Sequence, residues 1–238
     1  VSAVLCAPQF LLLNRDETVD DDTLASRLSY FLWSSMPDEE LLKLAKDGKL
    51  SDPKVRYAQV ERMLKSPKRE RFVKSFTGQW LDLREIEFTS PSTKLYPEFD
   101  ALLQESMIRE TEGFFDHLLE EDLSVMNFVD SDFAVLNERM ARHYGMDSVK
   151  GHEKSRVVKL PAESIRGGVM SQASVVKVSA NGTTTSPALR GVWLLENLLD
   201  RPVPPPPPGV PAVEPDIRGA TSIRDQLARH SEDSSCAR

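Results

Sequence analysis

The chain has 238 residues, 40% of them hydrophobic and 28% charged, and its formal net charge is −7. This size and composition are those of a globular protein that buries its own core, and the negative balance with scattered Lys and Arg excludes a nucleic acid as the expected partner. No apolar run reaches the roughly 18 residues of a membrane span, so no membrane-spanning segment is expected.

The first two thirds of the chain predict short helices joined by brief turns. Polar capping residues, prolines at first-turn positions and apolar residues at helical spacing mark these helices. Their expected starts are Asp22 or Thr23, Ser35, Ser51 to Pro53, and Ser66-Pro67. Because short connections force helices to pack as neighbours, the pattern predicts a helical bundle.

The longest helical pattern covers residues 98–120. Its expected inward stripe consists of Leu103, Met107, Phe114 and Leu118. Another face carries the acidic residues Glu105, Glu112 and Asp116. Carboxylates one turn apart can bind a metal or serve in acid–base chemistry, but the Glu-x-x-His pair of di-iron helices is absent. We therefore interpret this face as solvated and partly paired, and we assign neither catalytic residues nor metal ligands.

Residues 133–144 predict one more helix, which ends at Gly145. His143 lies near its C-terminus, where the helix dipole favours a cation, and we interpret its role as structural. A polar stretch at residues 147–153 predicts a domain boundary. Residues 156–160 alternate as a short strand that a proline ends.

The segment 167–199 is rich in Gly, Ser and Thr. Gly167-Gly168 permits a sharp turn or the close approach of another backbone, and Asn181-Gly182 is a turn signal. Ser186-Pro187 starts a helix. A Thr-rich loop that enters a helix can hold an anion or a propionate group, although its spacing alone favours a structural role. Dinucleotide, Walker and Gly-x-Ser-x-Gly motifs are absent.

The stretch 202–211 contains five consecutive prolines, Pro204 to Pro208. Proline excludes helix and central strand, so a stiff polyproline segment is expected. Such a rod can bind an aromatic-lined module, but we interpret it as a spacer.

The two cysteines lie near opposite ends of the chain. We expect Cys6 to be a small buried apolar residue. Cys236 is followed by Ala237 and Arg238, and the chain starts at Val1, so we expect a piece of a longer polypeptide. Cys236 stands where a Cys-x-x-Cys-His motif would begin and is our candidate for the first thioether to haem c.

Several stretches carry a resemblance to known proteins: residues 24–38, 76–81, 167–199, the proline run that follows, and 227–236. They resemble a family of large proteins abundant in planctomycete bacteria, which combine consecutive domains of unknown function with cytochrome-c-like segments. The resemblance implies that Cys236 opens a haem-binding motif, and that the protein is exported to the periplasm or another extracytoplasmic space. It implies no established activity.

The expected fold class is mainly α, with a helical-bundle domain followed by a smaller, loop-rich, mostly α domain that carries the polyproline segment. Residues 1–15 would be the tail of a preceding helical domain and residues 16–148 a helical domain of unknown function. Residues 160–238 would be a second such domain, truncated at its C-terminus.

The leading functional expectation is a part of a haem-bearing protein in electron transfer or haem-linked oxidation. Haem c would be present in the full-length protein and would not be bound by this piece alone. The expected partners are other domains of the same polypeptide and an unidentified redox partner. The alternative is a non-catalytic structural or interaction module of a large secreted protein. A third option is a hydrolase in the loop 183–190, tested at Ser186 or Arg190.

Overall fold

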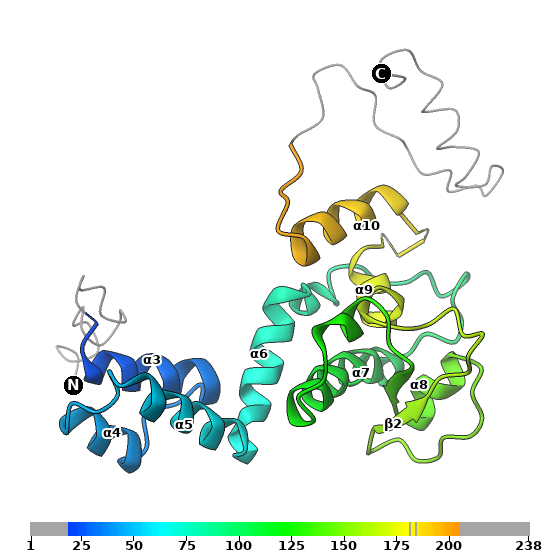
Figure 1. Cartoon of the computed structure of the whole chain (residues 1–238). Coiled ribbons are helices and arrows are strands. Elements are labelled where there is room, and N and C mark those ends of the chain that lie inside the picture. The colour runs from blue at the N-terminus through cyan, green and yellow to red at the C-terminus, as the bar shows by residue number, and fades with distance from the viewer. Residues whose placement is uncertain (1–18, 181, 184, 205–238) are drawn as a thin grey trace, which may run out of the picture. The chain divides into compact units, whose positions relative to one another are not determined.

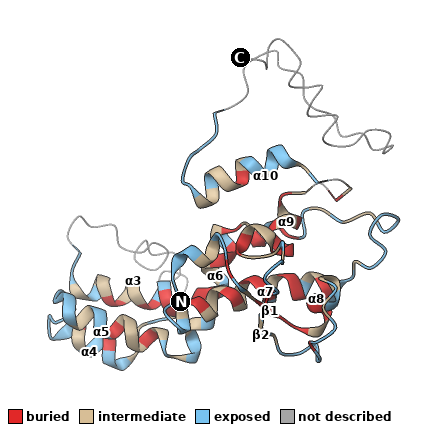
Figure 2. Cartoon of the chain, turned by 45° about the vertical axis from the view of Figure 1, so that its right-hand side comes forward, coloured by how far each residue is buried: buried red, intermediate tan, exposed pale blue. Residues whose placement is uncertain are grey.

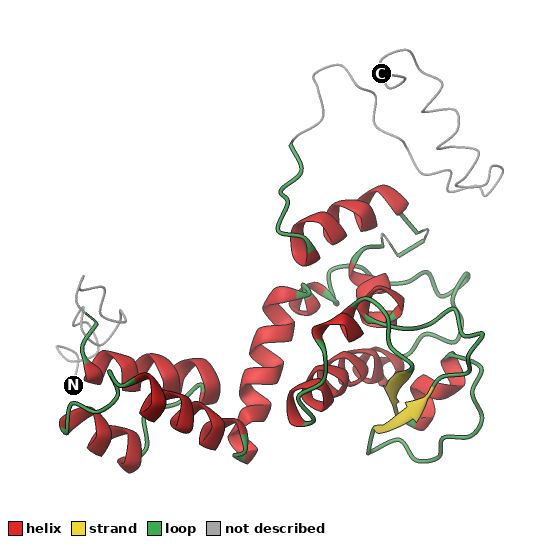
Figure 3. Cartoon of the chain, viewed as in Figure 1, coloured by secondary structure: helices red, strands yellow, loops and turns green. Residues whose placement is uncertain are grey.

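The computed structural model describes residues 19–204 apart from residues 181 and 184. Helices dominate this part of the chain, and its strands form one small sheet, which confirms the mainly α fold class (Figure 1, Figure 3). The chain divides into two compact units. Unit 1 comprises Val1–Thr77 and Phe115–Leu123, and unit 2 comprises Gly78–Phe114 and Ser124–Arg238.

Unit 1 is built from short helices that begin at side-chain caps. The helices are α3 (Asp21–Trp33), α4 (Glu39–Lys46), α5 (Pro53–Leu64), η1 (Pro67–Arg69), the first part of α6 (Glu70–Trp80) and the last part of α7 (Ala101–Glu120). The caps are Asp20, Asp38, Asp52 and Ser66, each of which accepts a hydrogen bond from a first-turn N–H. The expected starts at residues 51–53 and 66–67 are therefore confirmed.

The cap expected at Ser35 is wrong. Pro37 disfavours a helical backbone at Met36, so α4 begins only after the proline, with Asp38 as its cap. The Asp38 carboxylate accepts from the Leu41 N–H at 3.0 Å. The Ser35 hydroxyl is buried without a hydrogen-bond partner among the described residues.

The core of unit 1 lies between α3, α4, α5 and α6 and is coloured as buried in Figure 2. Its buried members are Ala25, Leu32, Trp33, Leu41, Ala45, Leu50, Met63 and Phe72. The Phe72 ring lies 5.0 Å from that of Phe31 and 5.9 Å from that of Phe115, between ring centres. Tilted aromatic contacts of this kind add to the area that these side chains bury.

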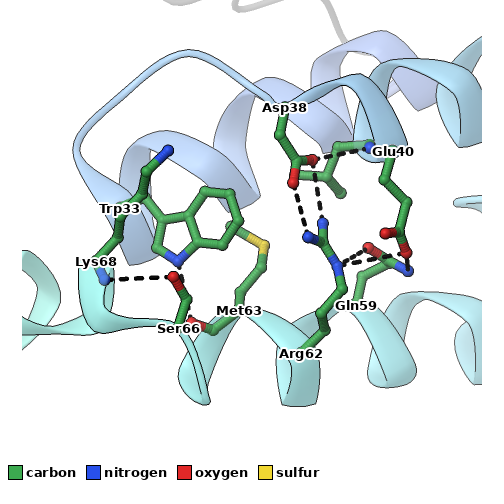
Figure 4. A network of polar contacts seen from close by, with 9 residues as sticks. Trp33, Asp38, Glu40, Gln59, Arg62, Met63, Ser66 and Lys68 are labelled. Carbon is green, nitrogen blue, oxygen red and sulfur yellow. Dashed lines mark hydrogen bonds and ion pairs between the residues drawn. The ribbon is translucent and has the colours of Figure 1, made fainter.

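A polar network joins the ends of α3, α4 and α5 (Figure 4). Arg62 donates to both carboxylate oxygens of Asp38, at 2.7 and 3.1 Å. The indole N–H of Trp33 donates to the Met63 carbonyl at 3.0 Å, and the Lys68 ammonium lies 4.7 Å from the indole ring centre. The network therefore holds the cap of α4 and the last residue of α3 against α5.

Unit 2 surrounds the N-terminal part of α7 (Ala101–Glu120). The other elements are η2 (Leu83–Glu85), η3 (Val125–Phe128), β1 (Phe133–Leu136), α8 (Glu138–His143), β2 (Arg156–Lys159), η4 (Val169–Ser171), α9 (Ala173–Val178), α10 (Pro187–Trp193) and the π-helical turn η5 (Leu194–Leu198). Strands β1 and β2 pair antiparallel, with Phe133 opposite Lys159 and Leu136 opposite Arg156. The short strand expected at 156–160 is confirmed.

The single helix expected at residues 133–144 is wrong in its first half. Residues 133–136 form strand β1, and only residues 138–143 form helix α8. Asn137 separates the two because its side chain caps α8 by accepting from the Met140 N–H at 2.9 Å. Pairing with β2 provides hydrogen-bond partners for the backbone groups of Phe133 to Leu136. The local sequence pattern of these residues does not reveal that partner. The expected end at Gly145 is confirmed by its positive φ of 73°.

The inward stripe expected on α7 is confirmed, because Leu103, Met107, Phe114 and Leu118 are all buried. Gly167 and Gly168 also confirm the expected close backbone approach. A Cβ on Gly168 would overlap the Val129 carbonyl and lie 2.6 Å from that of Phe128, and its φ is +68°. Only glycine fits there, and the loop that precedes η4 is held against the segment after η3.

Candidate functional site

Unit 2 contains a cavity of about 320 Å³. Its apolar wall comes from α7, α9 and the loop before α7: Phe99, Leu103, Met107, Ala173 and Val176. Thr183 and Thr185 from the Thr-rich loop line another part of it. A cavity of this size is at the lower end of those that take small organic ligands.

Arg166 and Tyr144 occupy one part of the cavity lining. The guanidinium carbon of Arg166 lies 3.4 Å from the centre of the Tyr144 ring, so the planar cation stacks on the aromatic face. Arg166 also donates from Nη1 to the Ser171 carbonyl at 3.0 Å. Within the described ranges the guanidinium makes no ion pair.

Glu110 lies behind Tyr144 and is 1% exposed. The Tyr144 hydroxyl donates to the two Glu110 oxygens, at 2.9 and 2.8 Å, and accepts from the Ala173 N–H at 2.9 Å. Burial raises the pKa of Glu110 to about 7, although the Tyr144 hydrogen bond and the charge of Arg166 act in the opposite direction. Burial likewise raises the pKa of Tyr144 well above its ordinary value. The Glu110 carboxyl, held by Tyr144 behind the cavity wall, therefore gains or loses its proton near neutral pH.

Lys177 lines the cavity from α9 and is 8% exposed. Its ammonium donates to the carbonyl of Ile86 and, at 2.9 Å, to that of Thr89. The Phe99 ring centre lies 5.6 Å away. Burial lowers the pKa of Lys177, opposed by the charge of Glu87. Like Arg166, it has no carboxylate at ion-pair distance in the part of the chain that the structure describes.

His143 does lie in the last turn of α8, but the cation expected there is not favoured. Burial and the positive charge of Arg166 lower its pKa, and the opposing charge of Glu98 is a smaller influence. The neutral imidazole therefore lines the cavity near neutral pH.

The Thr-rich loop confirms the helix start at Ser186, whose hydroxyl accepts from the Leu189 N–H at 3.3 Å. Arg190 donates to the Thr185 hydroxyl at 2.7 Å and to that of Ser179 at 3.4 Å. Ser186 and Arg190, the residues of the hydrolase option, thus serve a helix cap and a loop contact. Neither has a general base as its partner in these bonds.

The acidic face of α7 is partly paired, as interpreted from the sequence. Glu105 accepts from Arg109 at 2.5 Å, and Asp116 accepts from Arg69 at 2.9 Å. Among residues 19–204, less 181 and 184, no group of three or more His, Cys, Asp and Glu side chains is placed to hold a metal.

The sequence alone did not identify Glu110, Tyr144, Arg166 or Lys177 as members of one site. Only Glu110 carried a local signal. It lies three residues after Met107 and four before Phe114, which places a carboxyl on the buried stripe of α7. Cys6, Cys236 and four of the five consecutive prolines, Pro205 to Pro208, lie outside the described residues. The haem thioether expected at Cys236 therefore stays a prediction.

The fold and the cavity define a mainly α chain with a ligand-sized site in its second compact unit. The chain belongs to a family described as a protein of unknown function (DUF1592), which matches residues 19–146. A second family of unknown function (DUF1588) matches residues 166–238, so two such domains follow each other. No curated protein and no solved structure matches the chain. None of the described helices has the length and apolar character needed to cross a bilayer.

Proposed function

We propose that unit 2 binds a small, largely apolar molecule in the cavity between α7 and α9. The observation that carries this proposal is the hollow of about 320 Å³, which apolar side chains line and polar groups interrupt at a few points. Binding sites for small molecules have this composition, since apolar walls supply affinity and a few polar groups orient the ligand.

Octanol tests the proposal because it has an apolar chain and no charge. We expect calorimetry to detect its binding to the whole chain and the melting temperature to rise with octanol concentration. Val176→Phe places a larger side chain in the cavity wall and should weaken binding about ten-fold or more. Val157→Phe on β2 is the matched control, because Val157 is 48% exposed and lies outside the cavity lining. Equal binding by the two variants would contradict the proposal.

We also propose, as a second candidate, that the chain is a module of an extracytoplasmic haem c protein in electron transfer or haem-linked oxidation. Support comes from the sequence: two consecutive domains of families associated with cytochrome c, the second of which includes Cys236. Haem c supplies reversible one-electron chemistry when its axial ligands and burial tune the iron potential. The non-catalytic structural or interaction module is the alternative to this candidate.

The natural full-length polypeptide tests the haem proposal. Expression with a cytochrome c maturation system should give a Soret band and a haem stain that survives denaturation. Cys236→Ser should abolish the covalent stain, whereas Cys6→Ser should leave it. A colourless wild-type product, or a stain that Cys236→Ser leaves intact, would reject haem attachment at Cys236 and favour the non-catalytic module.

A further inference from the structure

We propose that the ligand of this cavity is a carboxylate with an apolar body, and that Arg166 binds its charged end. The inference rests on the proposed function, because it names the chemical class of a ligand that the cavity must first be shown to bind. It is carried by two cations, Arg166 and Lys177, that line the same apolar cavity without an ion-pair partner among the described residues.

Two cations in the lining of an apolar cavity favour an anionic ligand. Lys177 is buried and Arg166 is partly buried. A protein interior solvates charge poorly, so Lys and Arg side chains withdrawn from water are normally paired with carboxylates. Glu87 and Glu98 are the acidic neighbours, and Glu98 lines the cavity. Both are exposed, and neither reaches Lys177 or Arg166 at ion-pair distance. Glu110 influences Arg166 only through space, because its hydrogen bonds go to Tyr144 and Ala173. A ligand carboxylate would supply the missing negative charge.

Arg166 has N–H donors that are not used in hydrogen bonds to the described residues. Of its five N–H donors, one bonds the Ser171 carbonyl, and no other bond from its side chain is found in the described part. Stacking on Tyr144 fixes the plane of the guanidinium. A fixed, planar fork with unused donors binds a carboxylate through two parallel hydrogen bonds, and little side-chain entropy is lost on binding.

Lys177 adds positive charge but has less capacity for direct contact. Two of its three N–H donors already bond backbone carbonyls, those of Ile86 and Thr89. It therefore has one donor left for a ligand. Its charge, together with that of Arg166, raises the electrostatic potential of the cavity and disfavours a cationic ligand.

The rest of the cavity selects the body of the ligand. Phe99, Leu103, Met107 and Val176 present carbon atoms, and the volume suits a short aliphatic or single-ring acid. A dianionic phosphate ester fits less well, because phosphate sites usually offer several backbone N–H groups to the anion. An apolar wall beside one guanidinium, that of Arg166, favours a ligand with a single carboxylate.

A comparison of octanoate with octanol tests the inference, because the two share a chain and differ in charge. We expect wild-type protein to bind octanoate about ten-fold or more tightly than octanol. Arg166→Gln should bring the ratio of octanoate affinity to octanol affinity close to one. Arg156→Gln is the matched control, because Arg156 is an exposed arginine of the same unit that lies outside the cavity lining.

The outcomes separate the inference from the proposed function. If neither compound binds, the ligand cavity itself is rejected. If octanol binds as tightly as octanoate, or if Arg166→Gln leaves the preference for octanoate intact, the cavity stands and the carboxylate assignment is overturned. An equal loss in Arg166→Gln and Arg156→Gln would show a general surface-charge effect and would also overturn it. Tighter binding of octyl phosphate than of octanoate would reassign the site to phosphate esters.

Discussion

Glu110 lies among apolar side chains because helical spacing places it between Met107 and Phe114 on the inward stripe of α7. An ionised carboxylate there requires several donors. It has the Tyr144 hydroxyl and only a long contact from the Ala173 N–H, at 3.4 Å. Arg166 contributes charge without a direct bond. The neutral acid is therefore favoured up to about pH 7, the value of its pKa.

This raised pKa predicts a loss of stability as the pH rises. Between the ordinary value of 4.5 and about 7, the folded chain holds a proton at Glu110 that the unfolded chain has released. The free energy of unfolding then falls as pH rises through this window and levels off above it, by roughly 3 kcal/mol in total from this group. Glu110→Gln should flatten that part of the curve in urea unfolding measured from pH 5 to 8.

Glu105→Gln is the control for this experiment, because Glu105 lies on the same helix but pairs with Arg109 at the surface. It should leave the pH dependence close to that of the wild type. If Glu110→Gln retains the wild-type slope, then Glu110 does not carry the raised pKa. Gln keeps the shape of Glu and an acceptor for the Tyr144 hydroxyl, so gross misfolding is not expected.

Asp38 combines a helix cap with an ion pair. It accepts from the Leu41 N–H and from two nitrogens of Arg62, whose hydrogen bond is the largest cause of its lowered pKa (Figure 4). Asp38→Asn keeps a cap and loses the charge, whereas Asp38→Ala loses both. We expect unfolding free energy to fall by about 1 to 2 kcal/mol in Asp38→Ala and by less in Asp38→Asn.

The exposed pair Lys49–Asp47 provides the comparison for Asp38. Lys49→Gln should change the unfolding free energy by only a few tenths of a kcal/mol, because solvent screens exposed pairs. Denaturant unfolding of the three variants measures these differences. An Asp38→Ala variant as stable as Lys49→Gln would show that the network contributes little to unit 1.

At the scale of elements, the local sequence predicted a helix correctly where its start and its buried face depend on the helix's own residues. The capping aspartate after Ser51 and the stripe on α7 are examples, because caps and helical spacing act within a few residues. Strand β1 was missed because its stability comes from β2, some twenty residues away, and not from its own pattern. The cavity was missed for the same reason: Tyr144, Arg166 and Lys177 meet only through tertiary packing.

Two glycines, one crowded by backbone atoms and one with open space around it, predict opposite effects of alanine substitution on stability. Gly168 has a φ of +68°, and a Cβ there would overlap backbone atoms of Phe128 and Val129. Gly191 lies on α10, and a Cβ there would meet nothing within 4 Å. Gly168→Ala should therefore cost about 2 kcal/mol or more, whereas Gly191→Ala should stabilise by about 0.5 to 1 kcal/mol.

Denaturant midpoints of the two alanine variants test this contrast directly. The substitution is the same in both, so a change in side-chain chemistry cannot explain opposite signs. A neutral Gly168→Ala would mean that the loop before η4 moves away from the segment after η3. That movement would also displace Arg166, and it should then weaken octanoate binding in the same variant.

At the scale of the molecule, the cavity combines residues of both family matches. Phe99 and Tyr144 belong to the segment that matches DUF1592, and Arg166 and Lys177 belong to the segment that matches DUF1588. In the sequence, strand β2 lies between the two matched segments, and in the structure it pairs with β1 of the first segment. The domain boundary expected at residues 147–153 stays a prediction. The shared cavity is a physical reason why the two domains would occur together, since the described cavity lining needs both.

Hydrogen exchange on the whole chain tests this shared site. Octanoate that binds between the two segments should slow amide exchange in α8 and α9 together, because it stabilises the packing of both. Helices α3 to α5 belong to unit 1 and should exchange at their unliganded rates. Arg166→Gln should reduce the protection at a given octanoate concentration, and Arg156→Gln should retain it. Protection confined to α9, or spread evenly over both units, would contradict a site built jointly by the two matched segments.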